Sequence, residues 1–96
     1  MEIVTTGLAG TMESSDIMVT VSKPTGEGIT IELTSSVSKQ FGKQIRGVIR
    51  ECAQKLGVLA ADISAVDQGA LDCVIKARVK TAIYRACLST DYRWEV

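Results

Sequence analysis

The sequence predicts a small α+β fold, a two-layer sandwich in which two amphipathic helices cover one face of a mostly antiparallel sheet. Two segments alternate apolar and polar residues with the period of a half-buried strand, and two later segments repeat apolar residues with the period of a helix. A length of 96 residues suits one domain, and 46% hydrophobic with 23% charged residues is an ordinary globular composition. We therefore expect residues 1–96 to form a single domain.

The first third of the chain predicts a β-hairpin. Residues 1–15 are mostly small and polar and are expected to form an irregular lead-in, with at most a short strand near Ile3 and Val4. Apolar alternation on both sides of a turn-forming segment that contains proline and two glycines predicts two half-buried strands. Residues 17–33 are therefore expected to form an antiparallel hairpin, to which at least one further strand is added.

The rest of the chain alternates helix, strand and helix. Apolar residues three or four apart predict amphipathic helices over residues 36–56 and 70–87. Phe41 lies on the apolar stripe of the first of these helices, so we expect its ring in the core. Residues 62–67 predict a third strand, and residues 89–96 are expected to form a loose tail.

Composition excludes several classes of protein. The formal net charge is zero, which argues against nucleic-acid binding and against a polybasic membrane anchor. No apolar run approaches the roughly 20 residues of a membrane-spanning helix. The cysteines (Cys52, Cys73 and Cys87) are odd in number and widely spaced, which does not suit a disulfide framework. These features predict a cytoplasmic protein.

The chain has few groups for catalysis. It contains no histidine, which removes the usual general base, the usual activator of a nucleophile and the commonest zinc ligand. Cys52 and Cys73 lie among apolar residues of the two predicted helices, so both are expected to be buried as small hydrophobic side chains. We predict a carrier, binding or scaffold protein with no metal and no catalytic residue of its own.

Three short stretches carry a resemblance to one family. They are residues 9–16 (A-G-T-M-E-S-S-D), residues 35–42 (S-S-V-S-K-Q-F-G) and residues 67–73 (D-Q-G-A-L-D-C). In this order and in a chain of this length, they resemble the citrate lyase acyl carrier protein, or gamma subunit. The departures are small: Met12 stands where leucine is common in that family, and Gln68 stands where lysine is common.

The resemblance implies a covalent attachment site. The family attaches a 2′-(5″-phosphoribosyl)-3′-dephospho-coenzyme A group to the first serine of the opening motif, which corresponds to Ser14 here. Ser15 occupies a position that is serine or glycine in the family, so it is the weaker candidate. Glu13 and Asp16 flank the site, and together with Ser15 they either are recognised by the loading transferase or only keep the loop solvated.

The same resemblance implies a function and partners. The chain would be a non-catalytic carrier subunit of a hetero-oligomeric citrate lyase, with acetyl and citryl thioesters on the attached group. The alpha and beta subunits and the prosthetic-group transferase would be its partners, and the complex would cleave citrate to acetate and oxaloacetate. Two alternatives stay open: the carrier subunit of malonate decarboxylase, and a small interaction domain with no covalent cofactor.

Charges are distributed unevenly along the sequence. Residues 1–33 carry five acidic side chains and one basic side chain, whereas residues 39–55 carry five basic side chains and one acidic one. A solvated helix face explains the basic segment, and contact with a phosphate group or an acidic partner is the alternative. Exposed ion pairs contribute only about 0–1 kcal/mol each and are screened by salt, and the flexibility of the loop and the entropy of the attached group also oppose docking. We therefore expect this anionic group, the arm of the carrier, to be mostly free in the isolated chain and to become ordered only against the alpha and beta subunits.

Overall fold

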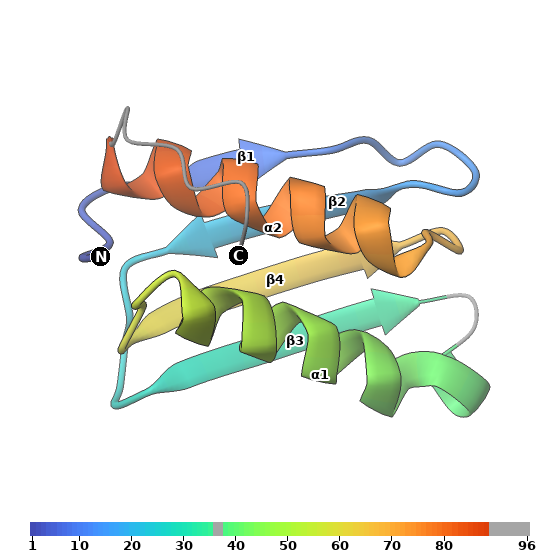
Figure 1. The fold of residues 1–96 in the computed structure, drawn as a ribbon, viewed down its shortest axis with the longest axis horizontal. Helices are drawn as coiled ribbons and strands as arrows, with labels where there is room; N and C mark the ends of the chain where they lie inside the picture. Colours follow the sequence, from blue (N-terminus) through green and yellow to red (C-terminus); the bar gives the residue numbers. More distant parts are fainter. Residues whose placement is uncertain (36–37, 89–96) are drawn as a thin grey trace.

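The computed structural model describes residues 1–35 and 38–88, except for the side chains of residues 38 and 39. In chain order, the elements are β1 (Gly7–Ala9), β2 (Ile17–Ser22), β3 (Ile29–Ser35), α1 (Ser38–Lys55), β4 (Ala61–Asp67) and α2 (Asp72–Cys87). Both helices lie on the same face of one four-stranded sheet (Figure 1). The predicted α+β sandwich is therefore confirmed, while the tail predicted for residues 89–96 lies outside the described residues.

The pairing of the strands differs from the predicted hairpin. The strand order is β1-β2-β4-β3, so β4 lies between the two strands that were expected to pair with each other. β2 pairs with β4 antiparallel, with Val19 opposite Ala65, and β3 pairs with β4 parallel, with Ile31 opposite Ile63. The hairpin over residues 17–33 is wrong because apolar alternation identifies a strand and its buried face but not its neighbour. The sheet is consequently mixed.

The lead-in also contains more structure than expected. β1 pairs antiparallel with β2, with Gly7 opposite Val21, and α2 packs directly against it. The residues suggested for a short strand instead precede β1, and the backbone N–H of Val4 donates to the carbonyl of Ala86 in α2. A Cβ atom on Gly7 would lie 2.1 Å from the carbonyl oxygen of Ala82, so only glycine allows this close approach of strand and helix.

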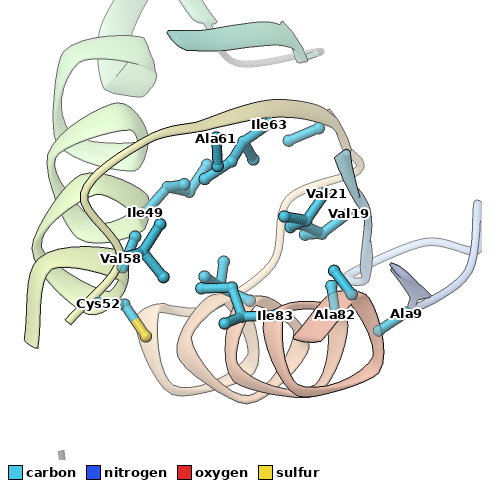
Figure 2. Packing of buried hydrophobic residues seen from close by; sticks show 14 of the residues in the cluster. Ala9, Val19, Val21, Ile49, Cys52, Val58, Ala61, Ile63, Ala82 and Ile83 are labelled. Carbon is cyan, nitrogen blue, oxygen red and sulfur yellow. The ribbon is translucent and has the colours of Figure 1, made fainter. Parts of the chain in front are cut away.

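The hydrophobic core lies between the sheet and the two helices. Figure 2 shows Val19 and Ile63 of the sheet pointing toward Ile49 of α1 and Ile83 of α2. These four side chains are almost fully buried, as is Cys52 on the same stripe of α1, which confirms the prediction for that thiol. Burial raises the pKa of Cys52, because the charged thiolate is disfavoured away from water.

Two predicted core residues lie at the surface. The ring of Phe41 is 47% exposed, because the first turn of α1 faces the connection before α2 instead of a packed helix. Cys73 is exposed as well. It precedes the buried Ile75 by two residues, which places it about 200° around the helix and therefore on the outer face of α2. The predictions that Phe41 and Cys73 are buried were both wrong. A periodic apolar pattern does not show whether another element lies opposite the end of a helix.

Candidate functional site

The predicted attachment residue lies at the corner of a tight turn between β1 and β2. The backbone N–H of Asp16 donates to the carbonyl of Glu13 over 3.2 Å, so Ser14 and Ser15 are the two central residues of a β-turn. Ser14 is exposed, and nothing within residues 1–35 and 38–88 hydrogen-bonds to its hydroxyl. An exposed hydroxyl is accessible for forming a phosphodiester.

Ser15 differs from Ser14 in its backbone conformation. Its φ is 64°, in the left-handed region that glycine adopts most easily. Its N–H donates to the carbonyl of Gln68 over 2.7 Å. The left-handed conformation accounts physically for the alternation of serine and glycine that the sequence resemblance associates with this position. Ser15 thus shapes the turn, and its hydroxyl is not required for that role.

The turn is fastened to the end of β4 through main-chain atoms. In addition to the bond from Ser15, the N–H of Gln68 donates to the carbonyl of Asp16 over 2.9 Å. Both bonds use the backbone of Gln68, so its side chain is free to vary without loss of either contact. Gln68 stands where lysine is common in the family, and this difference in side chain leaves the attachment turn in place.

Asp16 holds the base of the turn together. Its carboxylate accepts from the hydroxyl of Thr11 at 2.6 Å and from the N–H of Ile17 at 2.7 Å. Arg78 of α2 donates from Nε to Oδ1 at 3.0 Å and from Nη2 to Oδ2 at 2.9 Å. Only 13% of the Asp16 side chain is exposed. These donors, with Arg78 the largest contributor, hold the pKa of Asp16 well below its usual range, and Asp16 in turn raises the pKa of Arg78.

The residues flanking Ser14 therefore have different surroundings. Glu13 is exposed, and its N–H donates to the hydroxyl of Thr11. Asp16 is turned inward and paired, so its charge is largely neutralised at the surface of the turn. The sequence placed both carboxylates in one acidic loop and gave no indication of Arg78, which lies 62 residues away from Asp16 along the chain.

Asp67, the first residue of the third motif, stabilises the neighbouring connection. It is buried at the end of β4, and its carboxylate accepts from the hydroxyl of Ser35 and from the N–H groups of Gly69 and Ala70. These bonds shape the connection into α2. Ser35 and Asp67, the first residues of the second and third motifs, thus meet at the same end of the sheet as the Ser14 turn (Figure 1).

The basic segment of α1 lies on the other half of the molecule from this turn. α1 packs against β3 and α2, whereas the turn joins β1 and β2 (Figure 1). Two of its cations have contacts within the chain: Arg50 donates to the carbonyl of Ile29, and Lys55 pairs with Glu51 at 3.0 Å. Lys43 and Arg46 are exposed. This arrangement fits a largely solvated helix face.

Membrane-spanning and metal-binding features are absent from the described part of the chain. Within residues 1–35 and 38–88, no helix has the length and apolar character needed to cross a bilayer. Across those same ranges, no three histidine, cysteine, aspartate or glutamate side chains gather as potential metal ligands.

Comparison with known proteins decides the family. Residues 4–86 match the family model described as "ACP: Malonate decarboxylase delta subunit (MdcD)". A protein named citrate lyase acyl carrier protein from Streptococcus mutans is 57% identical over 95 residues, which cover 99% of this chain and 93% of that protein. Proteins of the same name from Streptococcus uberis and Lacticaseibacillus casei are 53% and 52% identical over the same shares of both chains.

The chain belongs to the citrate lyase acyl carrier protein family.

Membership of the citrate lyase acyl carrier protein family confirms the resemblance inferred from the three motifs. The family model is named for the malonate decarboxylase subunit, which was the alternative carrier in the sequence analysis. The relatives that match nearly the whole chain are named for citrate lyase. No solved structure gives a significant match to the chain.

Proposed function

We propose that this chain is the acyl carrier subunit of a citrate lyase and that Ser14 bears its covalent prosthetic group. The observation that carries the proposal is the exposed hydroxyl of Ser14, which has no hydrogen-bond partner in the described part of the chain. This hydroxyl lies in a turn that is anchored by hydrogen bonds, in a chain that belongs to this family. The group proposed is 2′-(5″-phosphoribosyl)-3′-dephospho-coenzyme A. When bound, it supplies a thiol that carries acetyl and citryl groups as thioesters.

The residues around Ser14 fit such a group. The hydroxyl faces solvent, so a long arm can leave the turn without displacing the core. Pairing with Arg78 removes much of the repulsion that Asp16 would exert on a phosphodiester, which leaves Glu13 as the exposed acidic neighbour. Hydrogen bonds to Gln68, directly after β4, and to Arg78 of α2 hold the attachment point in a defined position.

The contribution of the chain is positional and not catalytic. A tethered thioester reaches the active sites of two partner subunits at a high effective concentration. The partners proposed are the alpha subunit, which exchanges acetyl for citrate, and the beta subunit, which cleaves the citryl thioester to oxaloacetate. We further propose that the prosthetic-group transferase recognises the turn through Glu13, and that the hetero-oligomer works in the cytoplasm.

The choice between carriers rests on the full-length relatives. The cited relatives, at 52–57% identity across nearly the whole chain, are named for citrate lyase and favour it over malonate decarboxylase. Membership of a carrier-protein family, and not the exposed serine alone, argues against an interaction domain without a cofactor. Reconstitution of the loaded chain with citrate lyase alpha and beta subunits, and separately with malonate decarboxylase subunits, distinguishes the two carriers.

The attachment site is tested by mass spectrometry after co-expression with the loading transferase. We expect a mass increase equal to the prosthetic group, located on the peptide that contains Ser14. Ser14→Ala should abolish the increase. Ser15→Gly should retain it, because glycine adopts the left-handed conformation of that residue without strain. A group attached to Ser15, or loading that survives Ser14→Ala, would show that the assignment is wrong.

A further inference from the structure

A pocket of about 390 Å³ opens beside the attachment turn. Phe41 and Ile45 of α1 line one side, and Ala70 and Leu71 of the connection before α2 line the other. Its size is within the range of small-molecule sites. Phe41 is 47% exposed and Leu71 is 70% exposed, so two large apolar side chains border the same opening on the surface. Single exposed apolar residues are ordinary, whereas these two line one concavity, which makes it a candidate binding surface.

The pocket lies within reach of a group on Ser14. The backbone of Gln68 accepts from Ser15 and donates to Asp16, and the next residue, Gly69, already lines the pocket. The attachment turn is therefore hydrogen-bonded to Gln68, and Gln68 is directly followed by a residue that lines the pocket. A group tethered at this separation experiences a high effective concentration at the pocket, so even weak contacts populate the bound state.

The charges of the pocket select which part of the arm enters. Asp67, which is buried, and Asp72, which is exposed, both line the pocket, and the amide nitrogen of Gln44 lies 3.4 Å from each carboxylate oxygen of Asp72. Two carboxylates repel the pyrophosphate and the phosphodiester of the arm. The distal part of the arm is uncharged and contains two amide groups and the thiol. Its amide N–H groups suit the carboxylate and amide oxygens of the lining residues, and its methylenes suit the apolar walls.

We propose that this pocket holds the distal, thiol-bearing end of the arm while the carrier is not engaged with a partner subunit. The inference rests on the proposed attachment at Ser14. It revises the expectation of a mostly free arm, which weighed charge and chain entropy and could not include a pocket that residues from two separate motifs help to line. A docked thioester is shielded from water between visits to the partner active sites.

Backbone amide chemical shifts of the apo and loaded chains provide the first test. Intact mass establishes loading independently, so failure of attachment and failure of docking are separate results. We expect loading to shift the amides of Phe41, Ala70 and Leu71 as well as those of the turn. The amides near Leu59, an 86% exposed residue that lines a different pocket, should not move.

The rate of alkylation of the arm thiol provides the second test, measured by mass on the arm-bearing peptide so that Cys73 does not interfere. Leu71→Ser removes an apolar wall, and the variant should fold because Leu71 is the N-cap of α2, where serine is favoured. We expect alkylation to become roughly threefold faster, since only the undocked fraction reacts. Leu59→Ser is the matched control and should leave the rate unchanged.

Each outcome bears on the proposal. Pocket shifts together with faster alkylation in Leu71→Ser alone support docking. Loading on Ser14 with shifts confined to residues 10–16 and no change in alkylation would overturn docking and leave the carrier function intact. Equal effects of Leu71→Ser and Leu59→Ser would also overturn it. Pocket shifts that appear only when the alpha or beta subunit is added would instead assign the pocket to a partner. Absence of loading on Ser14 would refute both proposals.

Discussion

At the scale of single residues, the two serines of the turn are chemically alike and conformationally distinct. Ser15 has a φ of 64° and contributes its N–H to the bond with Gln68, whereas Ser14 presents an exposed hydroxyl. A residue whose left-handed backbone matters more than its side chain can be replaced by glycine. Backbone conformation therefore separates the attachment residue from its neighbour, which residue type alone could not do.

The Asp16–Arg78 pair gives a prediction at the same scale. Arg78→Ala should destabilise the chain by on the order of 1 kcal/mol, the upper range for exposed ion pairs, because the pair is bidentate but the Arg78 side chain is 39% exposed. Urea unfolding of wild type and variant at pH 7 measures the change. Lys76→Ala removes a cation from the same helix and serves as control; an equal loss there would contradict a specific role for the pair.

The pH dependence of the same pair follows from the lowered pKa of Asp16. The folded pKa lies below the ordinary value of 3.8, so the pair stabilises the fold above that value and loses its contribution as pH falls below it. The difference in unfolding free energy between wild type and Arg78→Ala should therefore be constant above about pH 5 and shrink in more acidic solution. A difference that grew on acidification would contradict the assignment.

At the scale of elements, β1 is held by contact with α2 as well as by pairing with β2. The strand has three residues, and its central Leu8 is exposed on the outer side. Gly7 and Ala9 face α2, and a Cβ on Gly7 would come within 2.5 Å of the backbone nitrogen of Ala86. Small side chains thus allow the strand and the helix to pack closely and to fix one end of the attachment loop.

Gly7→Ala tests this contact. The added methyl group would overlap backbone atoms of α2 that cannot rotate away, so the helix or the strand must shift. We expect a loss of about 1–3 kcal/mol, the usual cost of overpacking, measured by urea unfolding. Gly26→Ala is the matched control, because a Cβ atom on Gly26 would have nothing within 4 Å of it. Similar losses in both variants would show that chain flexibility, not packing, is responsible.

At the scale of the whole molecule, β4 joins the two halves of the fold. It pairs with β2 on one side and with β3 on the other, and it follows both of them in the sequence. Ile63, at its centre, is buried beneath the two helices (Figure 2). The sheet therefore cannot be completed until the later half of the chain has entered it, and the connection through α1 is the crossover that a parallel pair requires.

Comparing Ile63→Ala with Phe41→Ala tests where the core lies. Ile63→Ala should lower the unfolding free energy by about 2–5 kcal/mol, because it leaves a cavity beneath both helices. Phe41→Ala should cost less than about 1.5 kcal/mol, because nearly half of that ring is already exposed. Urea midpoints and slopes measured for both variants give the two values. A larger loss for Phe41→Ala than for Ile63→Ala would contradict this description of the core.

Local sequence patterns predicted every element except β1, and they indicated the family and the candidate attachment residue. Apolar periodicity located β2, β3, β4 and both helices, because the pattern reports which face of an element is buried. Motif order pointed to the family that the relatives confirmed, and with it to Ser14 as the proposed site. The inferences of elements and family are confirmed because they depend on neighbours within a short stretch of chain, and Ser14 stays a prediction.

The way in which these stretches meet depends on tertiary contacts. The tertiary structure replaced the expected hairpin with a sheet in which β4 separates β2 from β3, and it placed Phe41 and Cys73 at the surface. It also paired Asp16 with Arg78 and opened a pocket beside the attachment turn. Contacts between residues far apart in the sequence set the order of the strands, the burial of residues at the ends of elements and the long-range ion pairs. A local sequence pattern does not contain this information.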